Sequence, residues 1–473
     1  MKMKISALTA FLRNYGHRLK FIGELLLLLV LLIFIVNLNF EVNWANLWSH
    51  EHSNVAGWKH YPYNPPGTEI TFPRDEGLHP SNTTEWQIFY INLTGDNACN
   101  YSLITSYDRY GTFTNMFITL LNYTSGERYT AEMTGVVYGE EYFLNFMFKP
   151  FKYTQTCTHR LYQIPDKPFT YFFSHTSITD DGKKIQFSFT MDSRKPPMII
   201  GGNGIVEMGG GGYSYYYSLT HLSTEGVLQI DKEIVNVRGV GWFDHQWGNY
   251  KPKDGWEWFC AKLNGDIEIM ASHFINSTTG RTYNPFLYIY FPEHYIPTSN
   301  ISIIPLAYWR PAADSPEVYA MGWTLISEEY GLNITIEPVI RSQMVLEGIW
   351  WEGGCSVHGQ IGGRVVQGHG AAELFRTRTS EIVFRNISYT TQSLQNSTWI
   401  NITAEIFDEV EVKEAAVFYT SDEVWESMPM SQQDSIWTVH LLLPKDEKTK
   451  PVFYIWAEDD AGTEGESEVY FIL

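Results

Sequence analysis

The chain reads as a long series of short segments in which apolar or aromatic residues alternate with polar ones. Clusters of Gly, Asn, Asp and Pro separate these segments, which include EWQIFYINL, TNMFITLLNY, EYFLNFMF, KIQFSFTM and YSYYYSLTHL. Successive side chains of a strand point to opposite faces of a sheet, so this pattern is typical of half-buried strands. The sequence therefore predicts an all-β protein built from barrels or sandwiches.

Length, composition and charge limit the number of domains and the kinds of partner that we expect. A chain of 473 residues exceeds the size at which one core stops growing, so we expect two or three domains. Aromatic residues make up 16% of the chain, which suits pleated sheet surfaces. The formal net charge is −20, and this acidity repels phosphate backbones. Nucleic acid is therefore not an expected partner.

An apolar run near the N-terminus predicts a membrane anchor. Residues 21–36 read FIGELLLLLVLLIFIV, and the first 20 residues carry five basic side chains and no acid. The positive-inside rule then places residues 1–20 in the cytoplasm, a transmembrane helix at 21–40, and the main body outside the cell. A cleaved signal peptide is the alternative, but residues 36–40 offer no small-residue cleavage site. We expect a single-pass protein of the cell membrane, with a linker at 41–60.

Two further patterns concern the predicted exterior. Asn-X-Ser/Thr sequons occur only beyond the apolar run, which favours a glycoprotein. The cysteines show no CxxC spacing, so zinc is not expected, although Cys99 and Cys157 could pair in an oxidising compartment while Cys260 and Cys355 could be core thiols. The sequons begin at Asn82, Asn92, Asn100, Asn122, Asn276, Asn300, Asn333, Asn386, Asn396 and Asn401.

The most distinctive segment is GVGWFDHQWG at residues 239–248. Asp244 among Trp242, Phe243 and Trp247 would be poorly solvated, which raises a carboxyl pKa toward the range useful for a general acid. His245 could orient Asp244 or relay its proton. The alternative is a structural corner, in which Asp244 accepts backbone hydrogen bonds and the tryptophans plug the end of a barrel.

This segment resembles the central signature of the hydroxyneurosporene synthase (CrtC) / AttH family, and further motifs resemble that family in the same order. Together they span about residues 73 to 375. They are Asp75, Gly77 and His79 before Glu85 and Trp86; the tyrosine-rich residues 213–219; the signature; GWEWF at 255–259; and Trp351, Glu352 and Gly353 with Gly368, Gly370 and Glu373.

The resemblance implies two consecutive lipocalin-like barrels, the first at 61–250 and the second at 251–382. Barrels of this size are just wide enough to hold one small ligand. It also implies a hydrophobic substrate handled without metal or nucleotide, because characterised members include carotenoid 1,2-hydratases, kievitone hydratases and pericyclases. We therefore expect an isoprenoid or lipid-like small molecule as partner, and no cofactor.

Candidate site residues follow from these motifs. Asp244, His245 and Glu85 are the candidate catalytic residues, because adding a proton to an alkene requires an acid in an apolar pocket. Glu85 shares a strand face with Gln87 and could point into a lumen, or it could equally be a structural partner for an arginine or for a backbone corner. Aromatic faces could stabilise a carbocation. The candidate ligand-binding residues are Trp242, Trp247, Trp86, Tyr215, Tyr217, Trp256, Trp258, Trp351 and Glu352.

The chain also departs from the family pattern. Gln87 replaces a second tryptophan, and Tyr90 stands where a glycine is usual. Met270, Ala271 and Ser272 offer no acid where the carotenoid hydratases carry one. The resemblance therefore does not single out carotenoid hydration. There is also no GxSxG or HExxH motif, which sets common hydrolase and metallopeptidase classes aside.

Residues 383–473 differ in sequence pattern from the residues before them. They resemble the immunoglobulin-like or fibronectin-like sandwich domains of cell-surface proteins. The segments that carry the resemblance include SIWTVHLLLP and PVFYIWAEDDAGTEGESEVYFIL. Such a module implies a spacer, or contacts with cell-envelope proteins or glycans.

Two functions remain open on the sequence. In one, the barrels bind a hydrophobic molecule, with hydratase, isomerase or cyclase activity. In the other, filled barrels form a non-catalytic scaffold or adhesion protein of the cell envelope. Cavity volume discriminates between them, since ligand pockets measure about 300 to 1,000 Å³ and filled barrels have almost none.

Overall fold

The computed structural model describes residues 57–151, 157–311, 317–346, 348, 350–376, 378–379, 381–420, 424–433, 435–444 and 451–472. Strands dominate this part of the chain, and its helical segments are the short 3-10 turns η1 (Arg74–Glu76) and η2 (Glu328–Tyr330). The predicted all-β fold class is confirmed. The predicted transmembrane helix lies outside the described residues, and within them no helix has the length and apolarity needed to span a membrane.

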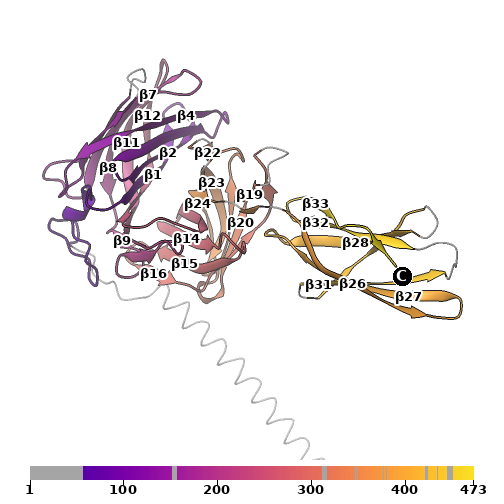
Figure 1. Cartoon of the computed structure of the whole chain (residues 1–473). Coiled ribbons are helices and arrows are strands. Elements are labelled where there is room, and N and C mark those ends of the chain that lie inside the picture. The colour runs from indigo at the N-terminus through magenta and orange to yellow at the C-terminus, as the bar shows by residue number, and fades with distance from the viewer. Residues whose placement is uncertain are drawn as a thin grey trace, which may run out of the picture.

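The first sheet closes into a barrel, which we call barrel 1 (Figure 1). Its strands follow the order β11-β12-β1-β2-β3-β4-β5-β6-β7-β8, and β8 pairs back with β11. The bounds are β1 (Thr84–Gly95), β2 (Asn100–Tyr110), β3 (Phe113–Asn122), β4 (Arg128–Gly139), β5 (Asn145–Pro150), β6 (Thr158–Gln163), β7 (Thr170–Ile178), β8 (Lys184–Ser193), β9 (Met198–Ile199), β10 (Ile205–Glu207), β11 (Tyr213–Ile230) and β12 (Glu233–Gly248).

Alternation of side chains explains this barrel. Every second residue of β8 is buried, from Ile185 to Ser193, which is the pattern of a strand with one face on the core. Strand β12 runs close to β1, where a side chain in place of Gly239 would collide with the carbonyl of Asn92. The interior is filled with aromatic and aliphatic side chains, including Phe89 and Phe243, whose rings stack at 4.4 Å.

The second sheet, which we call sheet 2, curls around a separate core. Its order is β16-β15-β14-β13-β24-β23-β21-β20-β17, and within the described residues no pairing joins β16 to β17. The bounds are β13 (Gly255–Leu263), β14 (Ile267–Ile275), β15 (Thr282–Tyr290), β16 (Tyr295–Thr298), β17 (Ser302–Pro305), β20 (Trp323–Ser327), β21 (Leu332–Pro338), β22 (Met344–Val345), β23 (Trp350–Ile361) and β24 (Arg364–Phe375).

Every residue of β14 is buried, unlike the alternating strands of barrel 1. One face of β14, including Ile269 and Ala271, lies in the core of sheet 2. Its other face, including Met270 and Phe274, joins a third cluster shared with Ile88 and Trp242 of barrel 1. The two sheets therefore pack against each other through their outward faces (Figure 1).

The remaining strands form smaller sheets. Strands β18 (Tyr308–Trp309), β19 (Glu317–Ala320) and β25 (Arg378–Thr379) pair with one another. At the C-terminus, two sheets share one apolar core and form a sandwich beside sheet 2 (Figure 1). Their strands are β26 (Val383–Ser393), β27 (Ser397–Phe407), β28 (Val412–Thr420), β29 (Glu426–Pro429), β30 (Ser431–Gln433), β31 (Ile436–Pro444), β32 (Val452–Asp459), β33 (Glu464–Glu466) and β34 (Tyr470–Phe471).

Candidate functional site

The signature strand β12 presents two different faces. Trp242, Asp244 and Gln246 face outward toward sheet 2, where Asp244 and Gln246 line a pocket. Phe243 and Trp247 belong to the interior core of barrel 1, and His245 between them is also fully buried. Alternation along one strand thus splits the predicted site between two compartments.

The pocket lies between barrel 1 and sheet 2, not inside a barrel lumen. The first sheet contributes residues of β1, β2, β10, β11 and β12, and sheet 2 contributes residues of β13, β14, β15, β23 and β24. Seven aromatic side chains and four carboxyl groups line it. The lining residues are Trp86, Ile88, Ser106, Asp108, Val206, Met208, Tyr216, Asp244, Gln246, Trp256, Trp258, Ser272, Phe274, Phe286, Trp350, Glu352 and Glu373.

Asp244 accepts hydrogen bonds from three neighbouring side chains. The hydroxyl of Tyr216 donates to Oδ2 at 2.9 Å, the hydroxyl of Ser218 donates to Oδ1 at 2.5 Å, and the indole N–H of Trp242 donates to Oδ1 at 2.7 Å. Burial outweighs these bonds and raises the pKa of Asp244 to about 7. Asp244 can therefore hold or release a proton near neutral pH.

Two glutamates of sheet 2 lie opposite each other on β23 and β24. Glu352 and Glu373 are paired in register, and the hydroxyl of Tyr90 lies 3.3 Å from Oε2 of Glu352 and 3.4 Å from Oε2 of Glu373. The indole N–H of Trp256 donates to Oε1 of Glu373 at 2.8 Å. Burial and the charge of the other glutamate raise the pKa of Glu352 well above its ordinary value. Burial, with the charges of Asp108 and Asp244, raises the pKa of Glu373 to about 8.

Asp108 on β2 is the fourth acid of the pocket. Ser106 donates its hydroxyl to Oδ1 of Asp108 at 2.5 Å, and burial raises the pKa of this carboxyl to about 7. No resolved Lys or Arg side chain lines this pocket. The pocket therefore holds four carboxyl groups without a cation, so protonated carboxyl groups persist in it near neutral pH.

Several polar atoms of the pocket wall have no partner within the protein. They are the indole nitrogens of Trp86, Trp258 and Trp350 and the amide oxygen of Gln246. Buried polar atoms are normally hydrogen-bonded, so these positions suit water or polar groups of a ligand. The aromatic faces beside them suit an apolar or cationic group.

The cavity itself is small. It measures about 60 Å³, which is room for a few water molecules and well below the roughly 300 to 1,000 Å³ of pockets that hold drug-sized ligands. The interiors of barrel 1 and sheet 2 are filled by their own cores. A ligand of isoprenoid size therefore requires the half-buried rings of the pocket wall, such as Trp86 and Phe286, to move.

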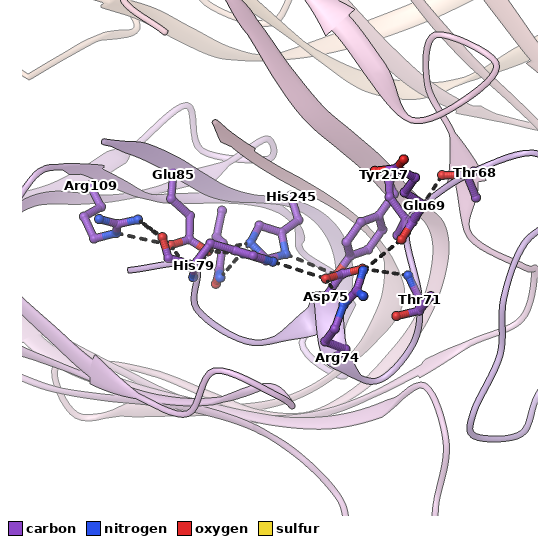
Figure 2. Close-up of polar contacts among 12 residues, drawn as sticks. Thr68, Glu69, Thr71, Arg74, Asp75, His79, Glu85, Arg109, Tyr217 and His245 are labelled. Atoms are coloured by element: carbon purple, nitrogen blue, oxygen red, sulfur yellow. Dashed lines mark hydrogen bonds and ion pairs between the residues drawn. The ribbon is translucent and has the colours of Figure 1, made fainter. Parts of the chain in front are cut away.

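Glu85 and His245 belong to a second polar group, inside barrel 1 (Figure 2). Oε1 of Glu85 lies 2.9 Å from Nε2 of His245 and 3.0 Å from Nδ1 of His79, while Arg109 donates to Oε2 at 2.9 Å. Asp75 faces the other ring nitrogen of His79 at 3.5 Å. Figure 2 shows these side chains as a continuous chain from Arg109 to Asp75. This network ties the segment around η1 to β1 and β12.

The ionisation of this network is set by its partners. Burial raises the pKa of Glu85, but the hydrogen bonds with His245 and His79 outweigh burial and hold it far below its ordinary value. Burial lowers the pKa of His79, but the interactions with Asp75 and Glu85 outweigh burial, so the pKa lies above its ordinary value. Burial also lowers the pKa of His245, and this effect outweighs the opposing effect of Glu85, so the pKa lies below its ordinary value. Glu85 is therefore a permanent carboxylate and is not suited to donate a proton.

Among the residues that the structure describes, two sets of three side chains have the spacing of metal ligands. His79, Glu85 and His245 form one, but Arg109 and two histidines already saturate Glu85. His221, Asp266 and Glu268 form the other, where Lys195 and Lys262 both bind Glu268. In both sets, ion pairs explain why the ligand-type side chains lie close together.

The structure distributes the predicted ligand-binding residues over three places. Trp86, Trp256, Trp258 and Glu352 line the pocket, and Trp242 donates to Asp244 beside it. Trp247, Tyr215 and Tyr217 associate with the interior of barrel 1, where Trp247 stacks on His79 at 4.0 Å. Trp351 is fully buried in the core of sheet 2.

Sequence reasoning missed Asp108, Tyr216 and Gln246 as pocket residues, and it gave Glu373 no role. It also missed Tyr90, whose hydroxyl contacts Glu352 and Glu373 beside the pocket. Alternation along the strands could have identified some of them, because residues two positions apart point to the same face. Trp86 and Tyr90 share one face of β1, and Trp242, Asp244 and Gln246 share one face of β12. The sequence contains no pattern from which the packing of that outward face against sheet 2 could have been predicted. The cysteines form no disulfide in the structure, so Cys99 and Cys157 are unpaired thiols there.

Comparison with known proteins finds a family model that is similar to part of this chain. Residues 165–376 match the AttH-like family model. The match includes Asp244, Glu352 and Glu373 but not Glu85, Trp86 or Asp108. A comparison with curated proteins finds no match.

Two crystal structures share the fold. A protein assigned as an AttH from Nitrosomonas europaea has a TM-score of 0.55 at 20% identity, covering 67% of this chain and all of its own. Kievitone hydratase from Nectria haematococca has a TM-score of 0.52 at 18% identity, covering 67% of this chain and 98% of its own. At these identities the likeness establishes a shared lipocalin-like fold and leaves the chemistry to the site.

Proposed function

We propose that the pocket between barrel 1 and sheet 2 performs acid catalysis on a hydrophobic, isoprenoid or lipid-like molecule, in a protein anchored in the cell membrane with its body outside. The reaction class is hydration of a carbon–carbon double bond, or a related isomerisation or cyclisation. The observation that carries the proposal is Asp244, a buried carboxyl with a pKa of about 7 in an aromatic wall. The fold shared with kievitone hydratase supports it.

The chemistry is balanced without any further reagent. Asp244 gives its proton to one alkene carbon, and the neighbouring carbon becomes a cation that the faces of Trp86 and Trp258 can stabilise. A water molecule held by the unpartnered polar atoms of the pocket adds its oxygen to that cation. The extra proton of the adding water then returns to the Asp244 carboxylate. Isomerisation follows if the cation instead loses a different proton to a carboxylate.

The test uses the full-length chain and a total lipid extract of its own host, incubated in deuterated water. Wild type is expected to form a product heavier by one D₂O, with one deuterium fixed on carbon. Asp244→Asn should lower product formation by at least about 100-fold, as loss of a general acid does. Glu225→Gln, an exposed acid on β11 outside the pocket, serves as the matched control. Equal product from wild type and Asp244→Asn would contradict the proposal.

A second function is favoured by the small cavity and the filled cores, namely a rigid cell-envelope scaffold carrying the C-terminal sandwich. It predicts that native mass spectrometry of the purified chain finds no bound apolar molecule and that the lipid extract yields no product. The immunoglobulin-like character of residues 383–473 and contacts with envelope proteins or glycans belong to this proposal.

A further inference from the structure

One surface of barrel 1 carries a group of exposed apolar side chains, which we call the apolar face. It comprises Phe113 on β3, Tyr138 on β4, Met147 on β5 and Phe151 just after β5, which are 59%, 56%, 54% and 49% exposed. Tyr142 and Phe143, also exposed, lie in the loop between β4 and β5. Soluble proteins rarely leave so many large apolar side chains together in water, so such a surface indicates a binding partner.

Strand register shows that these side chains are neighbours. Tyr138 on β4 is paired with Met147 on β5. The rings of Phe113 and Phe151 meet edge to face at 5.8 Å. The outward residues of β4 alternate with buried ones such as Met133, so this surface faces away from the core of barrel 1.

The apolar face is continuous with the pocket. Ser106 and Asp108 line the pocket from the outward face of β2, and Tyr110 is the next residue on that face. The ring of Tyr110 lies 6.3 Å from that of Trp86, which also lines the pocket. Phe113 is the register partner of Tyr110 on β3. A continuous aromatic surface therefore leads from the apolar face to the pocket wall.

The first described residues of the chain lie at this same end of barrel 1. Trp58 packs on Phe169, just before β7 begins, and Lys59 binds Asp192 where β8 ends. In an antiparallel barrel, the start of β7 and the end of β8 lie at the end where β2 and β4 finish and β3 and β5 begin. From the predicted span at 21–40 to residue 57, the intervening chain can reach at most about 60 Å.

Charge does not decide the partner of this surface. Lys149 and Arg160 beside Met147 carry two positive charges, and Glu140 and Glu141 in the adjoining loop carry two negative ones. The surface is thus close to neutral in a chain of net charge −20. Tyr side chains are enriched at the interface of a bilayer, and Phe is common on the apolar surfaces of segments that lie in that interface. A neutral lipid surface therefore fits better than an acidic or basic protein partner.

We propose that the apolar face docks onto the outer surface of a lipid bilayer and places the Tyr110–Trp86 side of the pocket next to the membrane. A hydrophobic substrate can then reach the pocket from the bilayer without crossing water. Exposing apolar surface to water costs about 25 cal/mol for each Å². This inference rests on the proposed function for the nature of the substrate. The docking itself does not require turnover.

The experiment places the full-length chain in nanodiscs of phosphatidylcholine. Cysteines introduced by Tyr138→Cys and Met147→Cys carry an environment-sensitive fluorophore, and lipids bearing a nitroxide on the headgroup serve as quencher. Ile234→Cys is the matched control, because Ile234 is 65% exposed near the start of β12, at the opposite end of barrel 1. Wild type labelled in parallel gives the background from the native cysteines.

Docking predicts quenching at least about two-fold stronger at Tyr138 and Met147 than at Ile234, because interfacial side chains sit within 5 to 10 Å of the headgroups. Equal quenching at the three positions would overturn the proposal. Labels that are shielded but not quenched, with two chains in each disc, would overturn it in favour of a second copy of this chain. Because Asp244→Asn removes the proton donor and leaves the apolar face unchanged, the same labels in that variant separate a failure of docking from a failure of catalysis.

Discussion

Asp244 and His245 are consecutive residues of β12, yet they lie in different compartments of the protein. Asp244 lines the pocket between barrel 1 and sheet 2, and His245 binds Glu85 inside barrel 1. The signature that contains both therefore serves two purposes. One residue supplies a protonatable carboxyl, and the next fixes the strand that carries it.

Asp244→Asn should change stability in a pH-dependent way. The folded pKa of about 7 exceeds the unfolded value of about 3.9, so the favourable contribution of the protonated carboxyl is complete below about pH 4 and is lost as pH rises through 7. The loss amounts to at most on the order of 4 kcal/mol. We expect the stability of Asp244→Asn relative to wild type to rise between pH 4 and pH 8 in urea unfolding. A difference that is constant with pH, as expected for Glu225→Gln, would contradict this assignment.

The fold was more predictable than the site because alternation is a local property. The alternating segments predicted the strands, and the resemblance placed Asp244, Trp86, Trp256, Trp258 and Glu352 on functional motifs. The pocket depends on which face of β1 and β12 meets sheet 2, and that is decided by packing between residues more than 100 positions apart, such as Tyr90 and Glu352. The membrane anchor and the glycosylation of the sequons stay predictions.

Glu85→Gln should destabilise the protein without removing an acid from the pocket. Loss of the carboxylate leaves Arg109 and the histidine pair without their common partner, and breaking a buried ion pair costs about 3 to 5 kcal/mol. Because the folded pKa of Glu85 is depressed, its contribution is present above about pH 4.3 and is lost as pH falls through the lower folded value. Thermal unfolding at pH 7 measures the cost. A melting temperature equal to that of wild type would show that the network is dispensable.

Glu268→Gln should loosen the contact between barrel 1 and sheet 2. Glu268 on β14 is fully buried and binds Lys195, which follows β8, and Lys262 on β13. His221 of barrel 1 lies 3.1 Å from the same carboxylate. The variant leaves the buried Lys195 with Asp266, at 3.7 Å, as its remaining carboxylate partner, at a cost of up to about 3 to 5 kcal/mol. Hydrogen exchange should rise at β13 and β14 more than at β26 and β27. Equal protection in wild type and variant would contradict a role in joining the sheets.

Phe286→Ala should widen the pocket. Phe286 on β15 is half-buried in the pocket wall, and its truncation removes a ring from a cavity of about 60 Å³. We expect the variant to bind an aromatic fluorophore about ten-fold more tightly than wild type, with a stability loss below the 3 to 5 kcal/mol of a fully buried phenylalanine. Phe407→Ala, which removes an exposed ring from the C-terminal sandwich, is the control. Unchanged binding would show that another side chain limits access.

The most direct measurement is an infrared titration of the Asp244 carboxyl, taken as the difference between wild type and Asp244→Asn across pH 4 to 9. The account predicts a protonated-carboxyl band that disappears with an apparent pKa of about 7 and is absent from the variant. A band lost near the ordinary value of about 3.9 would contradict it, because Asp244 would then hold no proton at neutral pH.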